Sequence, residues 1–251
     1  MKKILILFIF FKLINSNIKA QSIGDFYQGG VVFYLDSFGG GLIVDIADLS
    51  NPNPVGGTTS LDTLLSRWGN YSNHVPGTSS PFLGSGETNT QNFISFYSNG
   101  NFAAHLCFNS NRGGYNDWFL PSKQELEEIF SYKALIDSVA LINGGHLFDD
   151  FATLYPYWSS TETPSTTDYR NAYAVYPGNF SVLRGKILEY KVRATRSFRS
   201  PINSITKIET NENKKVIKVF NLLGQESIPE PNTILIFLYS DGSIEKKISV
   251  K

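Results

Sequence analysis

The residue types that most often carry chemistry are sparse in this chain. The sequence has one cysteine, Cys107, and three histidines that are far apart. A single cysteine cannot form an intrachain disulfide or a thiolate zinc site, and scattered histidines do not indicate a metal hydrolase. No Ser-His-Asp set or nucleophile elbow is recognisable either. We therefore expect no catalytic residue, no metal and no cofactor, and we interpret Cys107 as a small buried side chain.

The carboxylates give no stronger signal for catalysis. Adjacent acidic pairs occur at residues 127–128 and 149–150, and Asp45 and Asp48 flank the end of a predicted strand. Such groups are more often solvated than catalytic. Across the chain, 22 Lys and Arg balance 22 Asp and Glu, so neither nucleic acid nor an anionic membrane surface is an expected partner. With 41% hydrophobic residues, the chain has enough apolar surface to bury a core.

Residues 1–20 are typical of a secretory signal peptide. Lys2 and Lys3 precede an apolar run over residues 4–11, and Ala20 supplies a small residue at the expected cleavage site. The run is shorter than the roughly 20 apolar residues of a spanning helix, so a membrane anchor is the less favoured alternative. No cysteine follows it for a lipid anchor. Removal of the four lysines in this segment would leave 18 basic and 22 acidic residues, and we expect no transmembrane span in the mature chain.

The composition changes near residues 201–205, which we interpret as a linker between two domains. All three tryptophans and most aromatic residues lie in 21–200, whereas 206–251 contains no tryptophan. The shorter part predicts an Asp241-Gly242 hairpin turn, because both turn positions favour positive φ. Its three strands are expected at residues 216–220, 234–239 and 244–250.

The larger part predicts strands, then helices, then strands, with long irregular segments between them. Residues 50–86 are rich in Gly, Pro, Ser, Thr and Asn and predict an irregular excursion. Ser122 and Glu125 form a predicted capping box at the start of an amphipathic helix that runs to about Ile136. The other predicted helices cover residues 88–97 and 102–107, and the predicted strands cover 31–35, 42–46, 157–161, 172–176, 180–183 and 191–198. This order indicates an α+β fold with an antiparallel sheet, and its long loops suggest a binding surface.

Three segments of the larger part resemble a known family. They are GGYNDWFLPS at residues 113–122, YWSSTE at 157–162 and KVRATRSF at 191–198. In this order they are similar to the bacterial Lcl C-terminal domains, and residues 23–30 and 84–91 fit the same pattern. The resemblance implies a C-type-lectin-like fold in which the first and last strands pair. It also implies an exported protein that adheres to glycans, although many members have no assigned ligand.

The aromatic and basic residues of these motifs also have a structural interpretation. We expect Trp118 to anchor the start of the capped helix within the core, and we favour a core position for Trp158. Arg193 and Arg196 are expected to form ion pairs or to cap loops rather than to bind an anionic ligand.

The resemblance places ligand contacts in the strands and loops that follow the helices, here residues 159–184. Tyrosines can stack on sugar rings or pack on protein, while amides and arginines can hydrogen-bond polar ligands. Strand alternation places Tyr173 and Tyr176 on opposite faces of the sheet, so we expect one of them in the core. A merely solvated loop is the alternative. The candidate ligand-binding residues are Tyr169, Arg170, Asn171, Tyr173, Tyr176, Asn179 and Arg184, with Thr167 and Asp168 as further polar groups.

The C-terminal part resembles a different family. Residues 218–226 (KVFNLLGQE) and 236–247 (IFLYSDGSIEKK) are similar to the C-terminal sorting domains of type IX secretion. The resemblance implies a small all-β sandwich that the outer-membrane translocon recognises. An ordinary β accessory module is the alternative.

These features together predict a secreted or surface-attached binding and adhesion module for a glycan or a surface protein. A passive component of the envelope or matrix is the main alternative. An enzyme related to formylglycine-generating enzymes is less favoured, because that chemistry requires a pair of thiols and only Cys107 is present. Residues 230–232 (EPN) spell a tripeptide of calcium-dependent lectins. They lie in the sorting tail, so we interpret them as a turn, because calcium needs six to eight converging oxygens.

Overall fold

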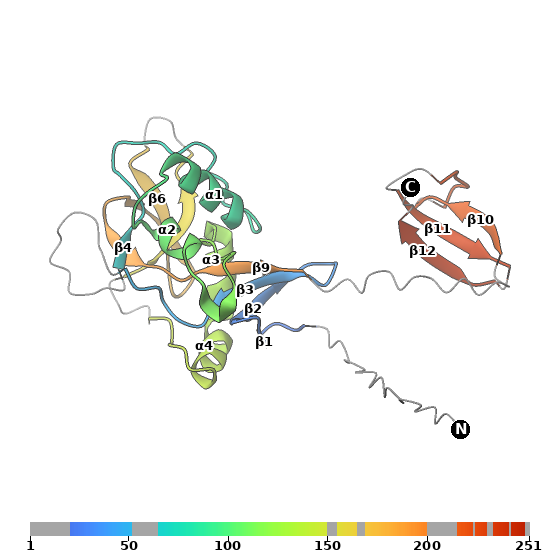
Figure 1. The fold of residues 1–251 in the computed structure, drawn as a ribbon, viewed down its shortest axis with the longest axis horizontal. Coiled ribbons are helices and arrows are strands. Elements are labelled where there is room, and N and C mark those ends of the chain that lie inside the picture. The colour runs from blue at the N-terminus through green and yellow to red at the C-terminus, as the bar shows by residue number, and fades with distance from the viewer. Residues whose placement is uncertain are drawn as a thin grey trace, which may run out of the picture. The chain divides into compact units, whose positions relative to one another are not determined.

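The computed structural model describes residues 21–51, 65–149, 155–164, 169–199, 215–222, 224–229, 233–240 and 242–248. The chain divides into two compact units, Met1–Ser200 and Pro201–Lys251. The predicted signal peptide and linker, the tripeptide at 230–232 and Asp241 lie outside the described residues, as do Thr167 and Asp168. The described elements form a mixed α+β structure with several antiparallel sheets (Figure 1). Among them, no helix is both long enough and apolar enough to cross a membrane.

The first sheet of the larger unit joins the beginning and the end of that unit. Its strands, in spatial order, are β1 (Phe26–Tyr27), β2 (Gly30–Leu35), β3 (Gly41–Asp45) and β9 (Thr195–Phe198). The last strand pairs with β3 rather than with the first strand, β1. Gly41 permits the close approach of β3 to its other neighbour, β2, because a Cβ there would lie 2.1 Å from the Tyr34 carbonyl oxygen.

The second sheet contains the segment in which we predicted ligand contacts. Its order is β4 (Leu65–Arg67), β8 (Glu189–Lys191), β5 (Tyr157–Glu162), β6 (Asn171–Tyr176) and β7 (Phe180–Gly185). Neighbouring strands pair antiparallel, apart from a single parallel pairing between β5 and β8. Strand β4 lies inside the predicted irregular excursion, where three residues are too few to produce a recognisable pattern.

The prediction of one strand over residues 191–198 is wrong. Strand β8 ends at Lys191 and β9 begins at Thr195, so the chain passes from one sheet to the other. Backbone carbonyls of the residues between β8 and β9 accept hydrogen bonds from the segment around the end of β3. Val192 O accepts from Leu49 N at 2.8 Å, and Ala194 O accepts from Asp45 N at 2.9 Å. These bonds replace the regular ladder at the crossing.

The predicted capping box is confirmed, but the single helix is not. The Ser122 hydroxyl accepts from Glu125 N at 3.2 Å, and Glu125 Oε2 accepts from Ser122 N at 2.8 Å. The helix then ends before Tyr132, whose φ of −108° and ψ of 15° depart from helical values, and a second helix follows. The helices of this unit are α1 (Gly86–Phe96), α2 (Ala103–Phe108), the short 3₁₀ helix η1 (Arg112–Gly114), α3 (Lys123–Ser131) and α4 (Lys133–Ile142).

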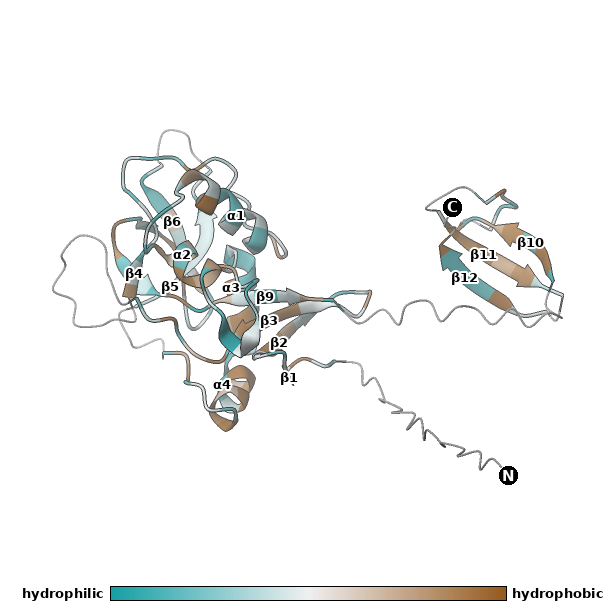
Figure 2. Ribbon diagram, in the orientation of Figure 1, coloured by the Kyte–Doolittle hydropathy of each residue, from teal (hydrophilic) through white to brown (hydrophobic). Residues whose placement is uncertain are grey.

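Two clusters of buried side chains form the core. One gathers Trp68, Trp118 and Trp158 with neighbours from α1 and α2, and the other gathers Phe130, Phe148 and side chains from β2 and β3. Trp118 is 1% exposed and Trp158 is 0% exposed, so both are core residues as predicted. Cys107 is also buried, and burial raises the pKa of its thiol. Figure 2 shows the apolar character of α4, whose Ile142 is exposed.

The smaller unit contains one antiparallel sheet of three strands. They are β10 (Val216–Phe220), β11 (Ile234–Tyr239) and β12 (Ile244–Ile248), with β11 in the centre. These bounds agree with the predicted strands as far as residue 248, and the last two residues of the third predicted strand, 249–250, lie outside the described residues. Within the part of the tail that the structure describes, there is one sheet rather than the two layers of the predicted sandwich.

Candidate functional site

The candidate ligand-binding residues lie on β6, on β7 and at their ends, and the two faces of this hairpin differ. Helix α3 packs against β6 and β7 on one face. Tyr173 and Val175 belong to that face, and Val175 is buried in the cluster around Phe130. On the opposite face, Ala172 and Ala174 are buried in the tryptophan cluster. The predicted alternation is confirmed.

Neither Tyr173 nor Tyr176 is a core residue, so the prediction that one would be is wrong. Both side chains are half-buried. The Tyr173 ring lies 5.7 Å from Lys123 Nζ on helix α3, and this helix covers it only in part. Tyr176 lies near the hairpin turn, beyond the buried alanines of its own face, where the core no longer reaches it.

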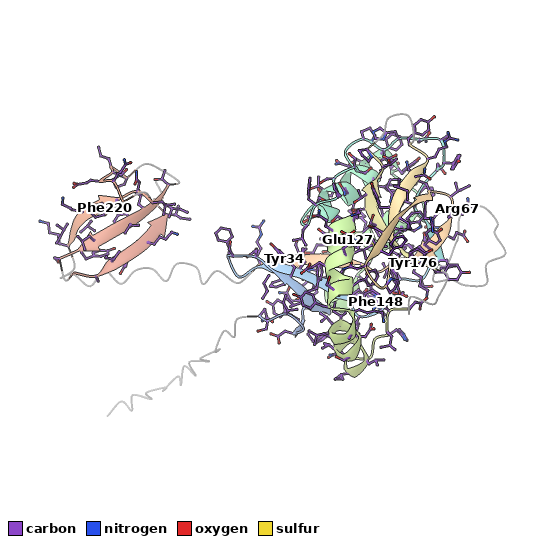
Figure 3. The ribbon with its side chains drawn as sticks, turned by 180° about the vertical axis from the view of Figure 1, so that it is seen from behind. Tyr34, Arg67, Glu127, Phe148, Tyr176 and Phe220 are labelled. Carbon is purple, nitrogen blue, oxygen red and sulfur yellow. The ribbon has the colours of Figure 1, made fainter. Side chains whose placement is uncertain are left out.

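One of the candidates, Asn179, has a structural role on the α3 side. Asn179 has a φ of 69° in the β6–β7 turn, a conformation that asparagine adopts more readily than most residues. Its amide donates to Ser131 Oγ at the end of α3 at 2.9 Å. Ser181, two residues later, donates to Glu127 Oε1 at 2.8 Å, and Glu127 is labelled on α3 in Figure 3. These contacts attach the hairpin to the helix, so Asn179 is not placed to contact a ligand on the opposite face.

Beyond the buried alanines, the opposite face carries the cluster that we call the tyrosine–arginine surface, made of half-buried Tyr176 and Arg184 and of Tyr190, which is only 9% exposed and belongs to the tryptophan cluster. Arg184 NH2 donates to the Tyr176 hydroxyl at 3.4 Å, and this bond is the main cause of a raised Arg184 pKa. Tyr190 also interacts with the Arg184 charge, and burial raises the Tyr190 pKa. The Tyr190 ring lies 4.8 Å from that of buried Trp158, which supports the cluster from below. The result is an ordered set of phenols around one cation, and Tyr176 is labelled in Figure 3.

A second aromatic and cationic pair lies at the Gly185 end of β7. The Arg170 guanidinium lies 5.6 Å from the centre of the Tyr71 ring, and Tyr71 is 44% exposed. A Cβ on Gly185 would lie 3.8 Å from the Tyr71 ring, so this pair is adjacent to the end of the strand. Tyr169 is half-buried in the turn that precedes β6, and Asn171 pairs with Gly185 across the hairpin. Sequence reasoning missed Tyr71 and Tyr190, because neither lies within residues 159–184.

The predicted ion pairs of the two motif arginines are confirmed. Arg193 is fully buried, and its Nε donates to Asp48 Oδ1 at 2.7 Å. Arg196 pairs with Asp117, and its guanidinium lies 3.8 Å from the centre of the Tyr115 ring. Both arginines therefore stabilise the fold.

Asp45 and Asp48 are internal ion-pair partners rather than solvated acids. Asp48 also accepts from the Tyr157 hydroxyl at 3.0 Å. Asp45 is fully buried, and its carboxylate lies 3.2 Å from Arg112 Nε. Burial raises the pKa of Asp45 to about 6, although Arg112 acts in the opposite direction. Their positions at a strand end were visible in the sequence, but their partners are far away along the chain.

A further buried pair lies beneath the segment that follows β4. Glu162 and Lys186 are both fully buried and form an ion pair. Glu162 Oε2 accepts from Val75 N at 3.0 Å and from the Thr78 hydroxyl at 3.1 Å. Burial lowers the pKa of Lys186, and Glu162 opposes that shift. This pair holds residues 75–78 against the second sheet.

The described residues contain no group of three or more His, Cys, Asp or Glu side chains placed to hold a metal ion. A scan against protein-family models finds no match for this chain, and a search of curated proteins finds none.

Proposed function

We propose that this protein is an exported adhesion module whose C-type-lectin-like domain binds a glycan or a surface protein through the tyrosine–arginine surface. One observation carries the proposal. Tyr176 and Arg184 are hydrogen-bonded to each other on a sheet face that α3 does not cover. Phenol rings supply flat contact area at a low entropic cost, and a guanidinium adds directional donors. Phe180, 58% exposed and paired with Tyr176 across the hairpin, would extend the contact area.

The smaller unit supports the export part of the proposal through its sequence resemblance to type IX sorting domains. Its three-stranded sheet agrees with an all-β tail. In this interpretation, the signal peptide directs passage through the inner membrane, and the translocon recognises the tail. The protein would then be released or held at the outer cell surface.

A glycan array on the purified protein, followed by binding assays on extracellular matrix proteins, tests the adhesion proposal. Tyr176→Ala and Arg184→Ala should each weaken binding by about tenfold, the loss of one hydrogen-bonded contact of about 1–2 kcal/mol. Lys123→Ala, on helix α3 itself and so on the other side of the hairpin, is the matched control and should bind as the unchanged protein does. The melting temperatures of all three variants establish that they are folded. If no glycan or matrix protein binds, the passive structural role is favoured instead.

A further inference from the structure

A cavity of about 450 Å³ lies beside the buried ion pair of Asp48 and Arg193, and its lining shares no residue with the tyrosine–arginine surface. Its walls come from the segment after β3, the η1 helix, the segment after α4 and the end of β8. This volume is within the range of small-molecule sites, about 300–1,000 Å³. Four chain segments thus converge on one pocket.

The charged side chains in the walls neutralise one another. Lys191 Nζ lies 2.9 Å from the Asp149 carboxylate and 3.6 Å from that of Asp48. Arg112, also in the wall, is paired with buried Asp45 behind it. Because each acid already has a basic partner, a charged ligand would find no unpaired opposite charge. It would have to disrupt an existing pair in order to bind.

Several polar groups in the walls nevertheless retain hydrogen-bonding capacity. Arg112 has five N–H donors, and its contacts with Asp45 and with the Asp48 carbonyl use at most three of them. The Ser50 hydroxyl and the His146 imidazole line the cavity and make no hydrogen bond to any described residue. Donors and acceptors that lie beside one another in this way match hydroxyl groups, each of which can donate one bond and accept others.

The cavity also has an apolar part. Ile46, Ala47 and Leu147 contribute to its lining, and Leu147 is 50% exposed. A ligand with carbon–hydrogen surface on one side and hydroxyls on the other could use both parts. We infer that this cavity binds a small neutral polyhydroxylated ligand, such as a single sugar ring, through Arg112, His146 and Asp149. This inference does not depend on the tyrosine–arginine surface.

Ligand-observed NMR and calorimetry on the whole protein test the inference. The probes are neutral methyl glycosides of glucose, galactose, mannose and N-acetylglucosamine, with sodium acetate, sodium sulfate and glycine as charged comparison ligands. We expect saturable binding of at least one methyl glycoside and none of the charged ligands. Asp149→Asn and His146→Ala should each weaken that binding about tenfold.

His146→Ala keeps the test decisive if Asp149→Asn reduces folding, because the His146 side chain is exposed. Tyr176→Ala is the matched control and should retain the methyl glycoside affinity even if it loses adhesion. This separates failure of the cavity from failure of the adhesion surface. The inference is overturned if no methyl glycoside binds, if only charged ligands bind, or if both pocket variants bind as the unchanged protein does.

Discussion

The buried pair of Glu162 and Lys186 provides a sharp test of how the larger unit is stabilised. Lys186 Nζ also donates to the Asn73 carbonyl at 2.8 Å and lies 4.7 Å from the centre of the Trp68 ring. Lys186→Met keeps most of the aliphatic length but leaves the Glu162 carboxylate buried without its cation. Loss of one partner of a buried pair costs about 3–5 kcal/mol, so we expect the free energy of unfolding to fall by about that amount.

A double-mutant cycle separates the pair from the packing around it. The double variant Lys186→Met with Glu162→Gln removes both charges of the pair. The amide oxygen of the new glutamine can still accept hydrogen bonds from Val75 N and the Thr78 hydroxyl. The double variant should therefore be more stable than the sum of the single effects predicts, by about 1–3 kcal/mol. Urea unfolding followed by tryptophan fluorescence is the assay, because all three tryptophans lie in the larger unit.

Lys123→Met is the matched control for this cycle. Lys123 pairs with Glu127 at 2.7 Å, but both side chains are about one quarter exposed, at 25% and 26%. An exposed pair of this kind contributes less than about 0.5 kcal/mol. If Lys186→Met also costs less than about 1 kcal/mol, or if the two single effects are simply additive, the argument for a stabilising buried pair is refuted.

Three further predictions concern the core, pH and export. Trp118→Ala should lower the free energy of unfolding by roughly 3–5 kcal/mol in urea titrations, because a fully buried ring is replaced by a cavity. A loss below about 1 kcal/mol would contradict the core position. Burial raises the pKa of Glu125 from 4.5 to about 7, so its contribution to stability is complete below about pH 4.5 and is lost as the pH rises through 7. Glu125→Gln keeps a capping acceptor and should flatten this part of the stability–pH curve in thermal melts, and an unchanged slope would show that Glu125 is not its cause. Deletion of residues 206–251 should leave a folded larger unit in the periplasm in cell fractionation, whereas normal levels at the surface or in the medium would contradict the sorting role.

Local sequence rules predicted the elements that local interactions stabilise. The capping box at Ser122 and Glu125 lies within one helical turn, and its start was predicted to the residue. The end of that helix was not predicted, because Tyr132 is not a helix-breaking residue such as glycine or proline. The chain turns there so that the apolar residues of α4 can pack against β2. The prediction of one strand over 191–198 was wrong for a related reason. Hydrogen bonds to the residues around the end of β3 divide this segment between two sheets.

The candidate site was predictable as a segment but not as a surface. Residue types in 169–184 correctly indicated aromatic and cationic side chains on a hairpin, because strand alternation can be counted along the chain. Strand alternation cannot show which of these side chains α3 covers, because that depends on how the helix packs against the sheet. As a result, Tyr173 and Asn179 contact α3 on one face of the hairpin. On the other face, Arg184 interacts with Tyr176 and Tyr190.

The cavity was beyond local sequence reasoning altogether. Its charged residues, Asp48, Arg112, Asp149 and Lys191, come from segments far apart in the chain, so no spacing rule connects them. One chemical signal was present, because acids at a strand end, such as Asp45 and Asp48, are costly to bury without partners. Arginine and lysine in the motif at 191–198 were the partners available, and Arg193 does pair with Asp48. Pairing of this kind satisfies the buried charges and leaves the walls of the cavity neutral, which is why a neutral hydroxylated ligand fits it better than an ion.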